Sequence, residues 1–183
     1  VAGHDPAWAA LFASECRTLH RALGSLAVDI QHVGSTAVPD LPAKPILDIA
    51  IAARTLDLVP AIVDRLTGIG YVYRGDAAGE GGHLFVREAE PNVRTAHVHV
   101  VEQGGAQWRN YVRFRDALLG DIDLRKGYAD LKGDLMKRFP NDRQSYTAAK
   151  NHFIQGVLKS KDQRTGVAIA ARRGSQALGG TTS

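Results

Sequence analysis

Apolar residues recur at helical spacing near the start of the chain. Asp5 followed by Pro6 is typical of a helix start, with a capping side chain before a proline in the first turn. Gly24 is typical of a helix end. The apolar positions between them are Trp8, Leu11, Phe12, Leu19 and Leu23. The pattern predicts an amphipathic helix that packs one side on a core.

Two apolar runs follow this helix and have the composition of strands. The first covers residues 26–33 and ends in the small residues Gly34 and Ser35. The second covers residues 45–53 and is apolar on both faces apart from Asp48, as expected of a central strand covered on both sides. The two runs predict strands of one sheet.

The middle of the chain predicts one helix and three short strands. A helical pattern begins at Asp57 and ends near Gly68, and a short strand begins at Tyr71. Residues 83–87 and 95–101 predict an antiparallel pair of strands. The glycine-rich residues before this pair, 75–82, are either a lid over a ligand or a simple connection.

The last part of the chain is helical until its periodicity ends. Apolar stripes predict helices over about residues 108–119, 124–139 and 146–158. From residue 161 the chain is rich in Gly, Ala, Ser and Thr, which is typical of a disordered tail. We therefore predict one α+β domain over residues 1–160, with a mixed β-sheet, an N-terminal helix and a C-terminal helical layer, followed by a tail over residues 161–183.

Composition narrows the class of protein. The 183 residues include one cysteine, Cys16, which excludes an intramolecular disulfide and fits a reducing compartment. No apolar run is long enough to span a membrane, so we expect a cytoplasmic protein without membrane association. The net charge of +4 favours anionic small ligands, but the basic residues are too scattered to indicate nucleic acid. The chain begins at Val1 and its one methionine is Met136, so we expect a processed product or a part of a longer protein.

Candidate phosphate chemistry lies where the first two predicted strands meet. Small residues at Gly34 and Ser35 let backbone N–H groups approach a phosphate closely. Asp48 is the strongest candidate for a divalent-cation ligand, because an unpartnered carboxylate in an apolar strand is costly. A structural ion pair is the alternative explanation of Asp48.

Three histidines extend this candidate site. His97 and His99 lie two apart in an apolar strand and therefore share a face, where they meet Asp48 if the two strands are neighbours. One carboxylate with two imidazoles suits Mn²⁺ or Zn²⁺ better than a two-Mg²⁺ site. His99 is also a candidate catalytic base, and His32 would orient a phosphate or act as a base. The alternative for all three is a hydrogen-bonded structural role.

The motifs HVGSTAVP (residues 32–39) and KPILDI (residues 44–49) resemble the GrpB family, which belongs to the nucleotidyltransferase-like superfamily. The similarity covers about residues 1–160 and includes residues 5–8, 94–101, 114–118 and 146–150. The resemblance implies a nucleotidyltransferase-like fold with Asp48 as a catalytic and metal-binding residue. The candidate substrate-binding residues are Gly34, Ser35, Thr36, Lys44, Arg113 and Lys150, with Lys150 chosen chiefly because residues 146–150 match the family. The alternative for the two lysines is an ordinary solvated side chain, and for Arg113 it is a structural network on the helix surface. Members of this family also occur fused to a dephospho-CoA kinase.

One departure from the superfamily pattern concerns the residue two positions after Asp48. That residue is usually acidic, and here it is Ala50. Because residues two apart on a strand share a face, the usual carboxylate pair is a lone carboxylate in this chain. Two-metal catalysis is therefore in doubt.

The sequence leaves two functions open. In the first, the protein binds a nucleotide with Mn²⁺, Mg²⁺ or Zn²⁺ and transfers NMP to an acceptor, with Asp48, His97 and His99 at the metal. In the second, it is a catalytically reduced binding or regulatory domain for a nucleotide or a CoA-related ligand, acting on a fused or partner dephospho-CoA kinase. A third class, aminoglycoside modification, needs an acidic cleft that the sequence does not indicate.

Overall fold

The computed structural model describes residues 2–76 and 82–177, with the backbone alone for residues 161–177. Residues 77–81 of the glycine-rich segment, for which the sequence left a lid or a connection open, lie outside the described residues. The chain divides into two compact units, Val1–Ala129 and Asp130–Ser183. The first unit holds the whole sheet.

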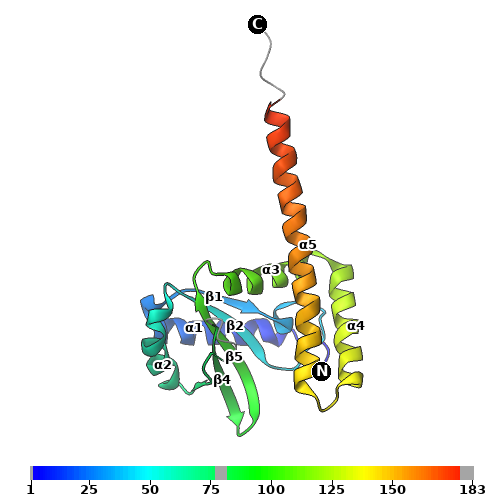
Figure 1. Ribbon diagram of the computed structural model, residues 1–183. Coiled ribbons are helices and arrows are strands. Elements are labelled where there is room, and N and C mark those ends of the chain that lie inside the picture. Colours follow the sequence, from blue (N-terminus) through cyan, green and yellow to red (C-terminus); the bar gives the residue numbers. More distant parts are fainter. Residues whose placement is uncertain (1, 77–81, 178–183) are drawn as a thin grey trace. The chain divides into compact units, whose positions relative to one another are not determined.

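The first unit is built on one mixed, five-stranded sheet (Figure 1). The strand order is β1-β2-β5-β4-β3, and β2 pairs with β5 in parallel while the other pairs are antiparallel. The strand bounds are β1 Ala27–Val33, β2 Leu47–Ala53, β3 Val72–Tyr73, β4 His83–Glu90 and β5 Val93–Glu102. The predicted strands are confirmed, and β2 lies between two neighbours as its apolar sequence indicates.

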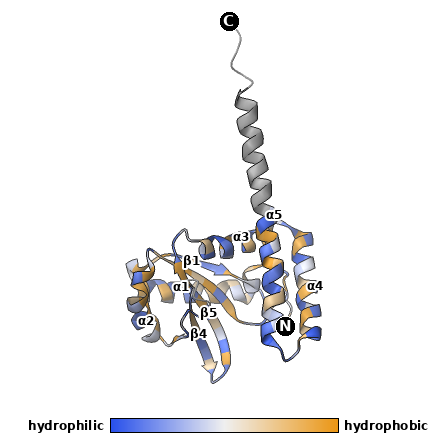
Figure 2. Cartoon of the chain, viewed as in Figure 1, coloured by the Kyte–Doolittle hydropathy of each residue, from blue (hydrophilic) through white to orange (hydrophobic). Residues whose placement is uncertain are grey.

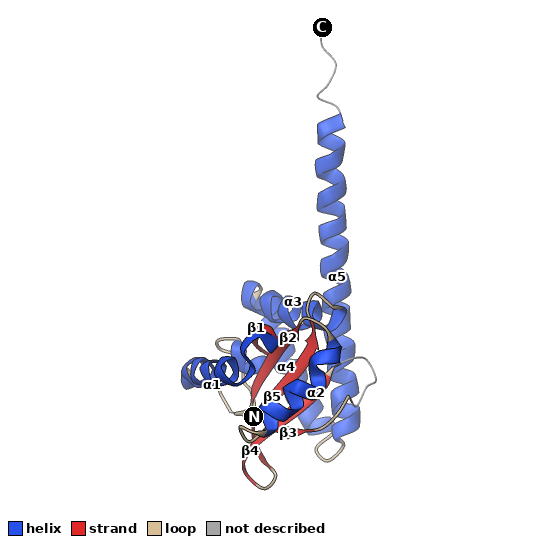
Figure 3. Ribbon diagram, turned by 90° about the vertical axis from the view of Figure 1, so that its left-hand side faces the viewer, coloured by secondary structure: helices blue, strands red, loops and turns tan. Residues whose placement is uncertain are grey.

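One face of the sheet packs against α1 (Ala7–Leu23) and α2 (Val59–Thr67). Figure 3 shows both helices beside the strands, and Figure 2 shows hydrophobic residues concentrated along the central strands. Fully buried side chains from the two helices and the strands form this core: Leu19, Ile49, Ile51, Ile62, Leu66, Phe85 and Val98. Burial of this apolar surface is the main stabilising term of the unit.

The helix starts differ slightly from the sequence expectation. Asp5 accepts a hydrogen bond from the N–H of Ala7 at 2.9 Å, so it does cap the first turn, while Pro6 lies just outside α1. Asp57 lies in a short 3₁₀ turn, Leu56–Leu58, and α2 begins after it.

The opposite face of the sheet packs against α3 (Ala106–Gly120). This helix contacts β1, β2 and β5, with Tyr111 against His99 of β5 and Arg115 bonded to Gln31 of β1. The unit therefore has helices on both faces of its sheet.

Helix α4 (Ile122–Arg138) begins in the first unit and continues into the second. The second unit also contains α5 (Arg143–Ala177), whose start is capped by Asp142 through a 2.9 Å bond from the N–H of Ser145. The backbone of residues 161–177 continues α5, which differs from the expected tail, and residues 178–183 lie outside the described residues. Residues that favour helices, mainly Ala, Lys, Gln and Arg, are frequent in this segment.

The fold class is the predicted one. An N-terminal helix, a mixed sheet and a helical C-terminal part make an α+β protein. None of the helices formed by the described residues is long and apolar enough to cross a membrane.

Candidate functional site

Gly34 lies against the Asp48 carboxylate at the end of β1. The last residue of β1, Val33, pairs with Asp48 of β2, so the following turn passes directly over this side chain. Gly34 has φ +71° and ψ −169°, a region that only glycine adopts readily. A Cβ atom at this position would lie 2.7 Å from the Cβ of Asp48. We call this contact the Gly34–Asp48 corner, and it exists only because residue 34 has no side chain.

His97 lies beside Asp48 in the sheet. The parallel pairing of β2 with β5 places the two residues opposite each other. His97 Nδ1 donates to Asp48 Oδ1 at 3.2 Å, and the side chains are 18% and 35% exposed. The other ring nitrogen, Nε2, is buried and has no hydrogen-bond partner among the described residues. Asp48 therefore has a partner, and the pair leaves one polar atom of His97 unsatisfied.

His99 shares the sheet face with His97 but lies farther from Asp48. Its partner across the β2–β5 pairing is Ala50, and the two imidazole centroids are 6.4 Å apart. The ring of His99 lies against Tyr111 of α3, at 5.1 Å between centroids. The condition set in the sequence analysis, that the two strands are neighbours, is therefore met.

Asp48, His97 and His99 provide only part of the ligand set that a metal ion would need. Among residues 2–76 and 82–177, no group of three His, Cys, Asp or Glu side chains lies close enough to hold a metal ion. The side chains of Asp48, His97 and His99 thus do not form a ready three-ligand cage. Mg²⁺ does not need three protein ligands, because proteins often hold it by one or two carboxylates together with substrate phosphates. Asp48 fits that arrangement, whereas the histidine pair does not add to it.

His32 and Thr36 occupy a different face of the sheet from Asp48. His32 pairs with Ile49, its ring stacks on Phe12 of α1 at 4.6 Å, and its Nε2 lies 3.0 Å from Thr36 Oγ1. Burial, opposed in part by the charge of Asp48, lowers the pKa of His32 to about 4. The Thr36 side chain is itself buried and also bonds the carbonyl of Ile46. The two side chains therefore bond each other, and Thr36 also joins the turn to the residue before β2.

The remaining predicted residues lie on separate elements. Ser35 is half-buried at the start of the 3₁₀ turn Ser35–Ala37 that follows Gly34, and Lys44 is exposed on the loop before β2. Arg113 is half-buried on α3, in the first unit. Lys150 lies on α5, in the second unit.

Two arginines that the sequence analysis did not select contact the backbone on either side of the turn. Arg115 bonds the carbonyl of His32, and Arg125 bonds the carbonyl of Pro39. For Arg115 there was a signal in the sequence, because residues 114–118 are part of the resemblance to the GrpB family. No signal in the sequence singled out Arg125, because an arginine on a solvated helix surface has the same pattern.

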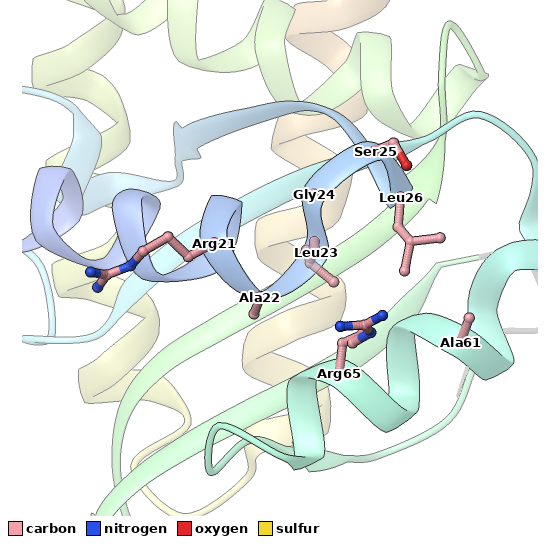
Figure 4. Close-up of a pocket in the computed structure, with 8 residues that line it drawn as sticks. All are labelled: Arg21, Ala22, Leu23, Gly24, Ser25, Leu26, Ala61 and Arg65. Atoms are coloured by element: carbon pink, nitrogen blue, oxygen red, sulfur yellow. The ribbon is translucent and has the colours of Figure 1, made fainter.

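A separate cavity of about 360 Å³ lies between the end of α1, the following 3₁₀ turn Gly24–Leu26 and α2 (Figure 4). In Figure 4, Arg65 extends toward Leu23, whereas Arg21 points away from the other lining residues. None of the predicted site residues lines this cavity. It therefore does not compete with the Gly34–Asp48 corner as the candidate site.

Known proteins are similar to this chain in sequence and, for one solved structure, in fold. A dephospho-CoA kinase of Mycolicibacterium paratuberculosis is 28% identical over a match that covers 85% of this chain and 44% of the kinase. The crystal structure of the conserved protein GrpB from Enterococcus faecalis superposes with a TM-score of 0.76 at 28% identity, covering 87% of this chain and 98% of that one.

More similar sequences settle the family. The glutamate-rich protein GrpB of Alkalihalophilus pseudofirmus is 34% identical over 85% of this chain and 91% of its own length. A UPF0157 protein of Pseudomonas aeruginosa is 37% identical over 92% of this chain and 67% of its own length. The family model described as GrpB protein matches residues 1–160. The chain therefore belongs to the GrpB family.

Proposed function

We propose that the Gly34–Asp48 corner binds the phosphates of a nucleoside triphosphate together with a divalent cation, and that the domain transfers NMP to an acceptor. One observation carries the proposal. The turn after β1 can pass over Asp48 only because residue 34 is glycine, and this brings backbone next to a carboxylate that is 35% exposed. A backbone turn beside an accessible carboxylate suits a phosphate with its counter-ion.

In this proposal Asp48 holds the cation and Ser35 contacts phosphate. Mg²⁺ or Mn²⁺ would share its ligands between Asp48 and the phosphate oxygens, and when bound it would neutralise charge that develops on the phosphates. His97 already bonds Asp48 and would set the orientation of its carboxylate. Zn²⁺ is the less suitable ion, because Asp48, His97 and His99 together do not form a three-ligand group that could hold a metal ion.

The transfer itself needs an acceptor and a base. An acceptor hydroxyl or phosphate oxygen attacks the α-phosphorus, and the bond between that phosphorus and the bridging oxygen of pyrophosphate breaks. Pyrophosphate leaves with the electron pair, and a hydroxyl acceptor gives its proton to a base. His99 is the candidate base on the face of Asp48, while His32 is on the other face.

A specific observation also favours the second function, a binding or regulatory domain. Ala50, at the position of the usual second acid, is fully buried between its strand neighbours, so this position supplies no second carboxylate. Two relatives named dephospho-CoA kinase contain a region similar to this chain. In this version the corner binds a nucleotide or a CoA-related phosphate without transfer and controls a fused or partner kinase in the cytoplasm.

A ligand matrix separates these functions. Thermal unfolding is followed with Mg²⁺, Mn²⁺ or Zn²⁺ in combination with each nucleoside triphosphate, CoA or dephospho-CoA, and pyrophosphate release is measured alongside. A ligand at a hundred times its Kd adds roughly 2.7 kcal/mol of stability, which the assay detects easily. The test variant is Asp48→Asn, and the matched control is Asp64→Asn, which removes an exposed carboxylate on α2.

The outcomes differ for each function. Stabilisation by a triphosphate that needs the cation, disappears in Asp48→Asn and persists in Asp64→Asn supports binding at the corner. Pyrophosphate release on addition of an acceptor mixture then supports transfer, and stabilisation without release supports the regulatory function. No cation-dependent response to any phosphate ligand, or an equal response in both variants, would reject the site.

A further inference from the structure

Arg115 links α3 to the edge of the sheet just before the Gly34–Asp48 corner. Its Nη1 donates to the side-chain oxygen of Gln31 at 2.8 Å and to the backbone carbonyl of His32 at 3.0 Å. Asp116 takes the other donors, with Nε at 2.9 Å and Nη2 at 2.8 Å from one carboxylate oxygen. The Arg115 side chain is 16% exposed. A guanidinium with this many fixed acceptors is held in one geometry.

The strand that Arg115 contacts lies at the edge of the sheet. Among residues 2–76 and 82–177, β1 pairs with β2 and has no strand on its other side. Edge strands have backbone groups that no other strand pairs, and their ends fray more readily than those of central strands. A hydrogen bond from α3 to the carbonyl of His32 restrains β1 two residues before Gly34.

A second arginine restrains the chain after the turn. Arg125, in the first turns of α4 and within the first unit, donates to the carbonyl of Pro39 at 3.2 Å. The turn between the two contacts contains Gly34 with its positive φ and its close contact to Asp48. That conformation is disfavoured for a free chain, so it persists only where surrounding contacts hold it.

We propose that Arg115 is a positioning residue for the phosphate-binding turn, with Arg125 as its weaker counterpart on the far side. Arg115 fixes the end of β1 so that Gly34 stays against Asp48, and it acts on ligand binding through the backbone rather than by touching phosphate. The part of this inference that concerns ligand binding rests on the proposed function. The other part, that Arg115 restrains residues 34–38 in the protein without ligand, does not depend on it.

The first measurement is amide hydrogen exchange of the full chain without ligand. In Arg115→Ala, exchange at residues 34–38 is expected to rise about tenfold, because the lost hydrogen bonds come from a charged guanidinium and a factor of ten corresponds to about 1.4 kcal/mol of local opening. Arg21→Ala is the matched control, because it removes an exposed arginine that bonds Thr18 on its own helix, away from the turn. Arg125→Ala is expected to give a smaller rise at the same residues. Exchange in Arg115→Ala equal to that in Arg21→Ala would overturn the inference, whether or not any ligand binds.

The second measurement uses Mn²⁺ with the triphosphate selected by the ligand matrix. If the wild type binds it, Arg115→Ala is expected to raise the Kd about tenfold, since 1.4 kcal/mol corresponds to a factor of ten. Arg115→Lys keeps the charge and is expected to restore part of the affinity in proportion to how far it restores slow exchange. A weaker Kd with unchanged exchange would show direct contact with phosphate and overturn the positioning role. A wild type that binds nothing rejects the proposed function, and the exchange experiment still decides on Arg115.

Discussion

The two faces of the sheet differ in the polar side chains that they carry. The face under α1 and α2 is filled with fully buried aliphatic and aromatic side chains, among them Ile49, Ile62 and Leu66. The face under α3 has Asp48, His97 and His99 on its central strands, all only partly buried. Apolar burial provides most of the folding free energy, so the first face carries stability and the second is free to hold polar groups. Function is therefore expected on the side that contributes less to folding.

The largest effect is expected on the apolar face. Leu66→Ala removes a fully buried side chain of α2 and leaves a cavity, at a cost of about 2–5 kcal/mol in the free energy of unfolding. Urea unfolding followed by tryptophan fluorescence measures this cost. Leu11→Ala, at a leucine that is 55% exposed, is the control and should cost far less. Equal losses in both variants would contradict the division between the faces.

The second-largest loss of stability is expected at the Gly34–Asp48 corner. Gly34→Ala places a Cβ against Asp48 in a backbone region reserved for glycine, so we expect a loss of about 1–3 kcal/mol in addition to loss of ligand binding. Gly24→Ala is a matched control, because Gly24 also has positive φ but open space around its Cα. The difference between the two variants measures the contact with Asp48. No difference would mean that Gly34 is needed for its dihedral angles alone.

A pH effect is expected from the histidine on the apolar face. Burial lowers the pKa of His32 to about 4, so the folded protein keeps this ring neutral while the unfolded chain takes up a proton below its ordinary pKa of 6.5. The contribution of neutral His32 to the free energy of unfolding is fully present above pH 6.5. It is lost as the pH falls toward 4, by at most about 1.4 kcal/mol per pH unit. Urea midpoints between pH 7 and pH 4 test this. His32→Asn should flatten the profile, whereas His20→Asn, at an exposed histidine, should leave it unchanged.

The smallest effect on stability is expected at the polar face. Asp48→Asn keeps the shape of a side chain that is 35% exposed, so the free energy of unfolding should change by less than about 1 kcal/mol. The same urea assay measures it, and it sharpens the comparison because ligand binding should disappear while the fold remains. A loss as large as that of Leu66→Ala would show that the Asp48–His97 pair is a structural element instead.

Much of the fold could be predicted from the chain, because local patterns determine local elements. Apolar periodicity located α1, and the unbroken apolar run around Asp48 identified β2 as a central strand. The alternation of His97 and His99 correctly placed the two rings on one face of β5. These features depend on residues close together in sequence, so the sequence alone was sufficient.

The side of the sheet on which each residue lies was decided by pairing between distant segments. His32 and Asp48 are both near the turn in sequence, but the register pairs His32 with Ile49 and Val33 with Asp48, so the two side chains point to opposite faces. A shift by one residue would reverse this, and a register irregularity between Ala27 and Asp29 shows that simple counting along β1 is not enough.

The sequence by itself determined most of the helices and strands, the family resemblance, and the presence of a lone carboxylate in the second strand. The tertiary structure alone decided that Gly34 contacts Asp48, that His97 bonds Asp48, and that Arg115 bonds the carbonyl of His32. The reason is physical. Periodicity reports which side of an element is buried, whereas contacts between elements depend on strand register and helix rotation, which only the packed chain sets.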